Sequence, residues 1–364
     1  MPTLQAPELN VPKCAAQHYR THAYDMATMV SQRLAQHEQF ENFLGNNPVQ
    51  LLTINHHNHA AFVAEVLASN HYRSLAQSLP WVYAAYHHQG VPFEYFLVEL
   101  ELWQQVIRNT LPPEAADAVL PVYDWMIQAH PHTIVAAQHH QSARLDVPAD
   151  YQAHFEQLWD DLLHSRYPQA VQYCRELLAQ GMSYQRLMHD LIYPIMVEVG
   201  ARWEQGKLSV ATEHQITAIV YALLATLYQE QDFVPMNGGR AVIAAVTQEF
   251  HQLGAWMLAT HLELEGWDVT QLDSPVSVVT LTETVVHVRP HIVALSVTMV
   301  SNVHAAHDLV AAVRHIAAEH DLNTRIAVGG RAFSVAPDLA ERLAPEVFRG
   351  NASEFIEWAR GLDL

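Results

Sequence analysis

The last third of the chain alternates short apolar runs with helical patterns, which limits its fold more than any other feature. Four runs rich in Val, Ile and Ala lie at 239–246, 267–272, 291–299 and 324–330. The helical patterns lie at 254–266, 277–288, 302–320 and 336–345. Strands that alternate with helices form a doubly wound parallel sheet.

A short fifth strand near 347–350 and a closing helix over 352–361 complete this pattern. Five such strands predict a flavodoxin-like, Rossmann-type parallel sheet domain over residues 232–364. Ligands of this architecture bind beyond the carboxyl ends of the strands.

Residues 149–231 are predicted to form a small four-helix bundle. A four-residue spacing relates Leu187, Leu191, Ile195 and Val199, as expected for one buried helix face. Pro194 predicts a kink in that helix, and Ser209 is a candidate cap for the next one. A linker rich in Pro and Gly, at 231–239, leads into the sheet domain.

Residues 1–148 are predicted to form a separate all-helical domain. Steps of three and four residues relate the apolar positions Phe93, Phe96, Leu100, Trp103 and Ile107. Proline-containing breaks at NNP, NPVQ, LPW, GVPF and LPPEAAD divide residues 15–132 into roughly five helices. Residues 130–148 are expected to connect this block to the bundle.

Charge argues against a nucleic-acid partner. The formal net charge is −19, from 19 Lys and Arg against 38 Asp and Glu. No segment is basic, since residues 1–148, 149–231 and 232–364 hold 6, 5 and 8 basic residues against 12, 10 and 16 acidic ones. Binding to phosphates needs clustered Lys and Arg.

The cellular location is inferred from cysteine spacing and from the search for signal-peptide and membrane-spanning patterns. Cys14 and Cys174 are the two cysteines, and their separation gives neither a disulfide framework nor a zinc ribbon. The chain shows no signal-peptide pattern and no run of 18 apolar residues. We therefore expect a cytoplasmic protein without a membrane partner.

Three motifs follow three of the predicted strands. They are Glu249-Phe250-His251-Gln252-Leu253-Gly254 after the first, Ser296-Val297-Thr298 after the third and Gly329-Gly330 after the fourth. Carboxyl ends of parallel strands meet at one edge of a sheet, so the motifs should lie together. One histidine among 25 carries little weight alone. Glu249 strengthens the case, because a carboxylate on one imidazole nitrogen orients the other nitrogen for a metal.

The combined motifs resemble the cobalamin (vitamin B12) binding fold of methionine synthase and its relatives. That family carries Asp-x-His-x-x-Gly, then Ser-x-Leu, then Gly-Gly. The resemblance implies that His251 is the lower axial ligand of cobalt, with Glu249 as its carboxylate relay. Gly254 would admit the flat cofactor. Four small residues would border its nucleotide tail, namely Ser296, Thr298, Gly329 and Gly330. Glu249 replaces the family Asp, and Thr298 replaces the Leu.

A second motif, in the predicted bundle, resembles one particular group of cobalamin-binding proteins. Trp203, nine further residues and then Glu213-His214 are similar to the Trp-x9-Glu-His signature of adenosylcobalamin light sensors of the CarH type. The resemblance implies that Trp203 packs against the adenosyl group and that Glu213 and His214 hold its ribose or adenine. Those repressors have a cobalt-capturing histidine after the tryptophan, where this chain has Glu204. Another histidine, His214 or water would then occupy the vacated position.

The N-terminal block is acidic and too long for the winged-helix DNA-binding domain of such repressors, so direct repression is not expected. Aromatic residues and histidines are concentrated at 79–96, and a tetrapyrrole needs aromatic walls, imidazoles and a cation. The combination resembles photocobilins, which join a globin-like biliverdin-binding domain to a CarH-like module. The resemblance implies noncovalent biliverdin, with candidate contacts at His57, Arg73, Tyr83, Tyr86 and His87. A haem site and a plain helical dimerisation or signalling domain are the alternatives.

The sequence thus predicts a photoreceptor rather than an enzyme. Light would break the Co–C bond of adenosylcobalamin and change domain or subunit packing, in a homo-oligomer with a separate signalling partner. A corrinoid protein that carries methyl groups between methyltransferases is the first alternative. A flavodoxin-like interaction module without a cofactor is the second.

Overall fold

The computed structural model describes residues 4–45, 47–142, 145–236, 238–247, 249–273, 276–335, 343, 348 and 351–362. The chain divides into two compact units. The first consists of Met1–Ala143 with Ala201–Leu208, and the second of Arg144–Gly200 with Ser209–Leu364. The predicted domain boundaries at 148 and 231 stay predictions.

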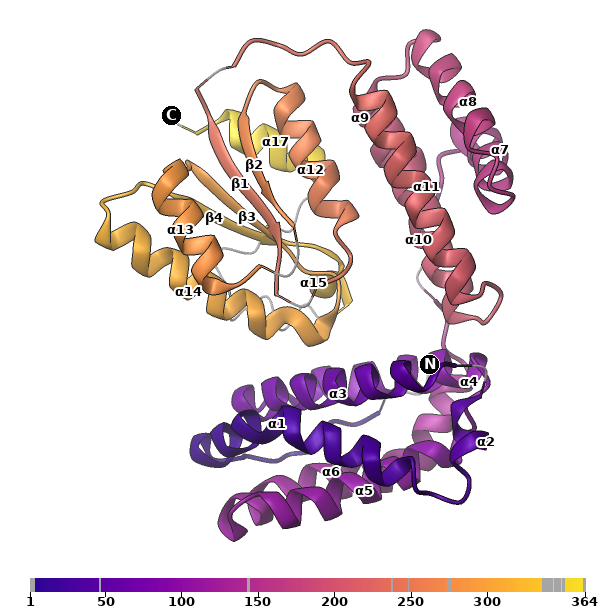
Figure 1. Ribbon diagram of the computed structural model, residues 1–364, viewed down its shortest axis with the longest axis vertical. Helices are drawn as coiled ribbons and strands as arrows, with labels where there is room; N and C mark the ends of the chain where they lie inside the picture. The colour runs from indigo at the N-terminus through magenta and orange to yellow at the C-terminus, as the bar shows by residue number, and fades with distance from the viewer. Residues whose placement is uncertain are drawn as a thin grey trace. The chain divides into compact units, whose positions relative to one another are not determined.

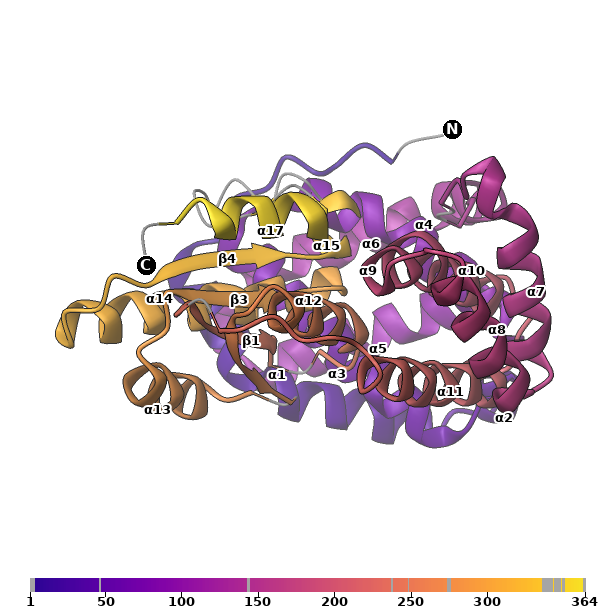
Figure 2. The same cartoon turned by 90° about the horizontal axis from the view of Figure 1, so that it is seen from above.

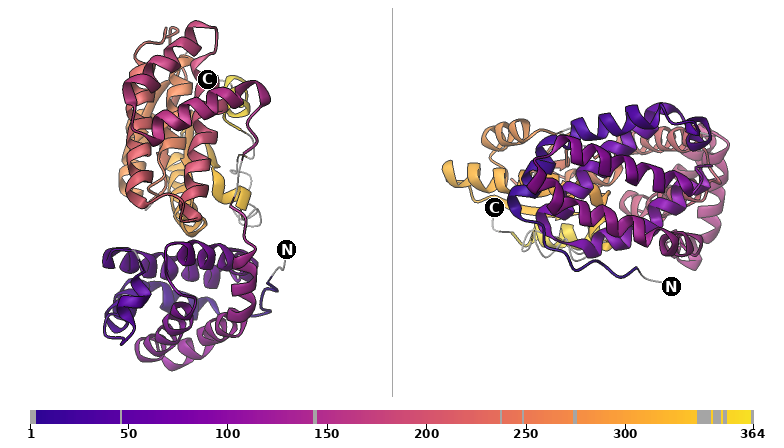
Figure 3. Two further views of the ribbon diagram at one scale, coloured as in Figure 1. Left: turned by 90° about the vertical axis from the view of Figure 1, so that its right-hand side faces the viewer. Right: turned by 90° about the horizontal axis from the view of Figure 1, so that it is seen from below.

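The first unit is helical, as the sequence predicts (Figures 1 and 3). Its helices are α1 (Lys13–Leu34), α2 (Phe40–Leu44), α3 (Val49–Ser69), α4 (Tyr72–His88), α5 (Glu94–Thr110) and α6 (Pro113–Gln138). Large side chains such as Trp103, Tyr19 and Tyr123 fill the core without exposure. Burial of such rings contributes most of the stabilisation that a helical domain gains from packing.

One predicted helix break in this unit is wrong. Pro80, in the LPW sequence, lies inside α4. Proline removes one backbone donor from the helix, but Leu79, Tyr83 and Ala84 are buried in the core around it. Tertiary packing of this face outweighs the local preference of proline. Helix α6 likewise continues past Pro131 to Gln138, into the predicted connection.

The helical bundle opens the second unit, as predicted. It contains a 3-10 turn (Ala149–Tyr151), α7 (Gln152–Leu163), α8 (Tyr167–Ala179), α9 (Tyr184–Arg186), a π-helical segment (Leu187–Ile192), α10 (Tyr193–Glu204) and α11 (Val210–Tyr228). Its apolar stripe is confirmed, since Leu187, Leu191 and Ile195 are fully buried. The Ser209 cap is also confirmed, because its Oγ accepts from the backbone N of Thr212 at 3.1 Å.

The kink predicted at Pro194 stays a prediction, but a π-helical segment (Leu187–Ile192) precedes α10. Pro194 is the second residue of α10 and cannot donate a helical hydrogen bond. A π-helical turn widens the backbone locally. The change of helix type therefore lies at Tyr193, the residue before the proline.

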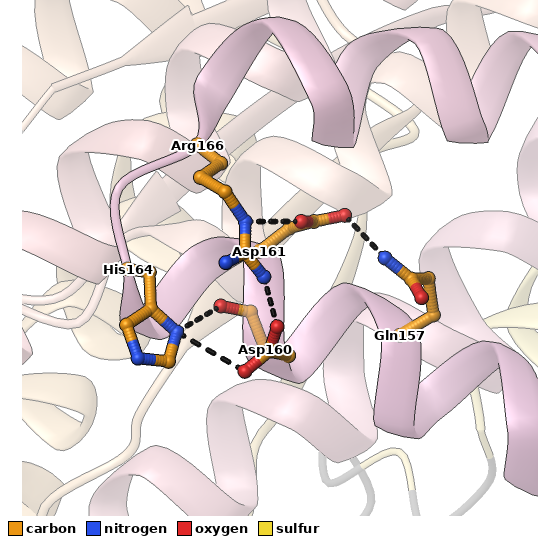
Figure 4. Close-up of polar contacts among 5 residues, drawn as sticks. All are labelled: Gln157, Asp160, Asp161, His164 and Arg166. Atoms are coloured by element: carbon orange, nitrogen blue, oxygen red, sulfur yellow. Dashed lines mark hydrogen bonds and ion pairs between the residues drawn. The ribbon is translucent and has the colours of Figure 1, made fainter.

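A polar cluster closes the turn between α7 and α8 (Figure 4). Arg166 donates to Asp161 at 2.7 Å and also pairs with Asp160. Gln157 donates to the second Asp161 oxygen at 3.0 Å, and His164 donates to the Asp160 backbone carbonyl at 2.8 Å. The Arg166 guanidinium lowers the pKa of Asp160. These contacts satisfy the buried Asp161 and fix the turn.

The second half of this unit is a parallel sheet, with the strands that the sequence predicts. They are β1 (Arg240–Ala245), β2 (Asp268–Leu272), β3 (Ile292–Ser296) and β4 (Arg325–Gly329), in the order β2-β1-β3-β4. Figure 2 shows β4, β3 and β1 following one another across the sheet. The predicted strand at 347–350 falls outside the described residues except for Phe348, whose backbone N donates to the Val328 carbonyl at 2.8 Å.

Helices cover both faces of the sheet (Figure 1). They are α12 (Leu253–Leu264), α13 (Val278–Val288), α14 (Val303–Glu319), the short α15 (Arg331–Val335) and α17 (Ala352–Arg360), with a 3-10 turn at Val300–Asn302. Val242 and Ala244 of β1 face the core under α13 and α14, while Ala241 and Ile243 face α12 and α17. This alternation is the two-residue period of a strand buried on both sides. The predicted helix at 336–345 falls outside the described residues apart from Leu343.

Helix α12 also contacts the bundle. Tyr228 of α11 donates to Glu263 at 2.6 Å, and the rings of His189 and His261 meet with Nε2 and Nδ1 3.2 Å apart. Burial, followed by the neighbouring His189, lowers the pKa of His261 to about 4. A neutral pair of imidazoles can share one hydrogen bond across this contact.

Among the described helices, α11 alone is long and apolar enough to cross a membrane. The core helix of a water-soluble protein meets the same criteria. Leu223, Leu224 and Leu227 of α11 are fully buried, and 28% of its apolar window is buried in total. One such helix is weak evidence for a membrane span.

Candidate cofactor site

Strand register brings the three predicted motifs together. Ala245 of β1 pairs with Ser296 of β3, and Ser296 pairs with Gly329 of β4. These residues form one row at the carboxyl ends of three neighbouring strands. The motifs that follow them, beginning at Glu249, Val297 and Gly330, therefore leave the sheet at one edge, where doubly wound folds bind ligands.

Glu249 is fully buried at this edge and accepts hydrogen bonds with both carboxylate oxygens. Oε1 accepts from the backbone N of His251 at 3.1 Å and contacts its Nδ1 at 2.6 Å. Oε2 accepts from the backbone N atoms of Thr298 and Met299, each at 2.9 Å, and from Nδ2 of Asn302 at 3.1 Å. Five donors from two loops thus surround one carboxylate.

These contacts keep Glu249 ionised. Burial alone would raise the pKa of this carboxyl, but hydrogen bonds and charge from His251 and the amides of Met299 and His251 lower it to about 2. A buried carboxylate that accepts several N–H bonds keeps its charge. Glu249 therefore presents a fixed negative charge to the Nδ1 atom of His251.

His251 is oriented by this carboxylate and remains accessible. Its side chain is 59% exposed although its partner Glu249 is fully buried. When Nδ1 carries its proton and donates it to the Glu249 carboxylate, the lone pair of Nε2 is available to a metal, which is the usual arrangement around a ligating histidine. The neighbouring Phe250 is also exposed.

The glycines of the motifs differ in their surroundings. A Cβ built on Gly254 would meet Ser296 Oγ at 3.9 Å, and one on Gly329 the Phe348 carbonyl at 3.7 Å. Gly330 has φ +120°, and a Cβ there would collide with the Val297 carbonyl. A Cβ at Gly254 or Gly329 would thus make ordinary van der Waals contact, whereas Gly330 is needed for the close approach of two backbone segments.

Thr298 serves the site through its backbone. The sequence predicts its side chain in a wall of the nucleotide-tail pocket, and that role stays a prediction. The structure shows the backbone N of Thr298 on Glu249. Ser296 and Thr298 both have partly buried side chains at this edge.

Sequence reasoning missed Met299 and Asn302 as partners of Glu249. Asn302 is 53 residues away in the chain and 6% exposed. A buried amide side chain shortly after the Ser-Val-Thr motif was the only available signal. No local pattern links it to the glutamate.

The candidate residues of the bundle lie at the ends of two helices. Glu213 and His214 stand in the first turn of α11, with Glu213 Oε2 3.3 Å from His214 Nε2 and Thr217 donating to Glu213 Oε1 at 2.9 Å. His214 is 74% exposed. Trp203 and the buried Glu204 end α10 and fall in the Ala201–Leu208 segment, which belongs to the first unit.

The candidate bilin residues have protein side chains as neighbours. Tyr83 is buried, stacks on Phe96 at 3.7 Å between ring centroids and contacts His130 Nδ1 at 3.0 Å. His57 stacks on Tyr24 at 4.3 Å.

The other three candidate bilin residues lie on α4. His87 stacks on Phe93 at 4.1 Å, Tyr86 is partly buried near Tyr95, and Arg73 is exposed. His57 and Tyr83 thus have different neighbours, from α1 and α5. Biliverdin, haem and a globin-like arrangement stay predictions without support from these contacts.

The core of the first unit instead holds a polar network that sequence reasoning missed. His56 lies between Ser31 Oγ at 2.7 Å and Tyr95 OH at 3.1 Å, and its Nε2 is 3.8 Å from Glu99. Trp103 donates to Glu99 at 3.2 Å. Burial raises the pKa of Glu99 to about 7 and lowers that of His56 to about 3.

Comparison with known families agrees with this geometry. Residues 239–357 match the family described as B12 binding domain, and residues 154–228 match a second family of the same description. The matches support a cobalamin-binding protein. The first covers the sheet with the Glu249–His251 pair, and the second covers the bundle.

Individual relatives divide into two groups. The HTH-type transcriptional repressor CarH of Myxococcus xanthus is 32% identical over 162 residues, which is 44% of this chain and 52% of that protein. Trimethylamine corrinoid protein 1 of Methanosarcina acetivorans is 23% identical over 200 residues, 54% of this chain and 90% of that protein. The chain thus spans about half the length of the first relative.

A solved structure, the Methanosarcina barkeri monomethylamine corrinoid protein, also resembles the chain. It is 18% identical, with a TM-score of 0.49, and covers 57% of this chain and 98% of that structure.

The donor set at the sheet edge fits a corrinoid. Within the described residues, no group of three or more His, Cys, Asp or Glu side chains is placed to hold a metal ion. A corrin ring supplies four nitrogen ligands of its own, so that a single protein imidazole completes the lower side of its cobalt. His251, held by Glu249 and exposed, could supply such an imidazole.

Proposed function

We propose that the chain is a light sensor that binds adenosylcobalamin. The observation that carries the proposal is the exposed His251 held by the fully buried Glu249, in the strand row of Ser296 and Gly329. The 32% identity to CarH supports the light-sensing reading. The spacing of Trp203 and Glu213-His214, which is similar to that of the light sensors, supports it as well.

Residues of the chain would hold the cofactor in distinct ways. His251 would bind cobalt through Nε2, Glu249 would fix the Nδ1 proton, and Gly254 would let the flat cofactor approach the start of α12. Glu213 and His214 would bind polar groups of the adenosyl moiety, and Trp203 would pack on it. When bound, adenosylcobalamin supplies a Co–C bond that light can break. Loss of the adenosyl group would remove contacts of these residues and change packing, which is the output of a ligand-biased switch.

The proposal includes a cytoplasmic protein without catalytic activity that changes its assembly with light and passes the signal to a separate protein. A methyl-carrying corrinoid protein is the competing function, because the chain resembles a trimethylamine corrinoid protein. Mass spectrometry of the cobalt ligand in purified holoprotein separates the two, since the light sensor carries adenosyl and the carrier methyl.

The test is reconstitution of the full chain with adenosylcobalamin in the dark, followed by green light. We expect a stable complex, a change in its absorption spectrum on illumination and a shift in elution volume on size exclusion. Matched protein kept in the dark should show neither change. Bound adenosylcobalamin with identical spectra and elution volumes before and after illumination would contradict a light sensor.

A further inference from the structure

The Ala201–Leu208 segment, which carries Trp203, is a structural part of the first unit. The chain leaves the bundle at the end of α10, joins the first unit and returns to the bundle at Ser209. The proposed cofactor contact Trp203 therefore lies on a turn that belongs to the same unit as α1 to α6.

The carboxyl end of α4 supplies the holding contacts. Nε2 of Gln89 donates to the Trp203 carbonyl at 2.8 Å. Nδ1 of His88 donates to the Glu204 carbonyl at 2.8 Å. The two carbonyls belong to the last turn of α10, where helical carbonyls lack partners within the helix. Two neighbouring side chains thus cap α10 from a position more than 110 residues away in sequence.

Gly206 brings the turn close to the same helix end. Its φ is +65°, and a Cβ there would collide with the backbone carbonyl of His88. Only glycine permits both this backbone conformation and this approach. The turn itself is closed by Gly206 N donating to the Trp203 carbonyl at 2.9 Å and Lys207 N to the Arg202 carbonyl at 2.8 Å.

We infer that Gln89 and His88 are positioning residues for Trp203, and that the affinity for a ligand that contacts Trp203 depends on them. The inference rests on the proposed function, because it takes Trp203 as a cofactor contact. A ligand that fixes Trp203 must then also order the end of α4, and a change in α4 must alter the affinity for that ligand, since coupling between two sites is reciprocal. The helix that carries the candidate bilin residues Tyr83, Tyr86 and His87 is thus joined to Trp203 by the hydrogen bond from Gln89 at its end.

The first experiment measures hydrogen–deuterium exchange of the cobalamin-free full chain. Gln89→Ala removes one cap, and loss of a hydrogen bond of ordinary strength should speed exchange across 203–208 by roughly fivefold. Gln77→Ala, the same change at an exposed residue of the same helix, is the control and should leave these amides unchanged. Equal exchange in the two variants would overturn the positioning role.

A glycine pair tests the same contact through the backbone. Gly206→Ala should displace the turn from His88 and speed exchange across 203–208 by at least as much as Gln89→Ala. Gly181→Ala is matched, because Gly181 also has positive φ (+98°) but no atom within 4 Å of a Cβ. It carries the backbone cost without the collision, so exchange at 203–208 should not change. Equal effects of both substitutions would contradict the inference.

The second experiment adds adenosylcobalamin in the dark. We expect Gln89→Ala and Gly206→Ala to raise the Kd of adenosylcobalamin by about three- to tenfold relative to their control variants. In wild-type protein, the ligand should slow exchange at 85–90. Unchanged affinity and unchanged exchange at 85–90 would overturn the coupling. If wild-type protein binds no adenosylcobalamin, the proposed function fails, whereas the cobalamin-free exchange still decides whether α4 positions the turn.

Discussion

At the scale of single residues, Glu249 decides what the site can do. It has no contact with solvent, yet its pKa falls to about 2 because His251 and backbone amides contribute more than burial costs. A carboxylate held in this way fixes the tautomer of its histidine partner. Glu249 therefore determines that Nε2, and not Nδ1, is the ring nitrogen of His251 that is free to bind a ligand.

We predict different losses from changes at these two residues. His251→Ala should retain the fold and lose the absorption signature of an axial imidazole on bound cobalamin. Glu249→Gln should keep the imidazole but weaken cobalamin binding by about 10- to 100-fold and reduce the free energy of unfolding by about 1–3 kcal/mol. Absorption titration and urea unfolding of cobalamin-free protein measure these effects.

The exposed His287 of α13 gives the control. His287→Ala should match wild-type protein in both measurements. A His251→Ala protein with an unaltered cobalamin spectrum would refute the ligand assignment.

At the scale of elements, helix α5 carries a buried acid whose charge opposes folding. Glu99 is 6% exposed, and burial raises its pKa from 4.5 to about 7. Between these two pH values the folded chain holds a proton that the unfolded chain has lost. Stability therefore falls as pH rises through this window, and the full cost is present above about pH 7.

We predict that Glu99→Gln removes this dependence, because the amide stays neutral. The stability of the variant relative to wild type should increase between pH 5 and pH 8 by an amount on the order of 3 kcal/mol. Urea unfolding followed by circular dichroism at both pH values measures the difference. Glu101→Gln on the same helix changes an exposed residue and is the control. A pH-independent difference between Glu99→Gln and wild type would show that Glu99 is ionised throughout.

At the scale of the whole molecule, charge separates this chain from a DNA-binding repressor. The relative CarH is described as an HTH-type transcriptional repressor, and the match covers 52% of it. The present chain carries 38 acidic against 19 basic residues. Such a balance repels phosphates instead of releasing their counterions.

We therefore predict no binding of the chain to duplex DNA, in the dark or after illumination. Fluorescence anisotropy with a labelled random duplex at about 0.15 M salt tests this. Binding tighter than about 10 μM, which lies within the nonspecific range of DNA-binding proteins, would contradict the prediction.

The sequence by itself determined the elements that depend on local pattern. The alternation of apolar runs and helices predicted β1, β2 and β4 within one residue at each end, and β3 ends three residues earlier than predicted. The Ser209 cap was visible from its position before α11. Because carboxyl ends of parallel strands meet at one edge, the proximity of the three motifs was also predictable. His251 and Glu249 could be paired because they are two residues apart.

Tertiary structure decided what depends on contacts between distant residues. Asn302 joins Glu249 across 53 residues, and Gln89 caps the Trp203 carbonyl across 114. Pro80 stays inside α4 because the buried face of that helix outweighs its local preference. Periodicity records which face of an element is buried, but not which partner buries it. For that reason the sequence indicated the pair of Glu249 and His251, and only the folded chain connected Trp203 to Gln89.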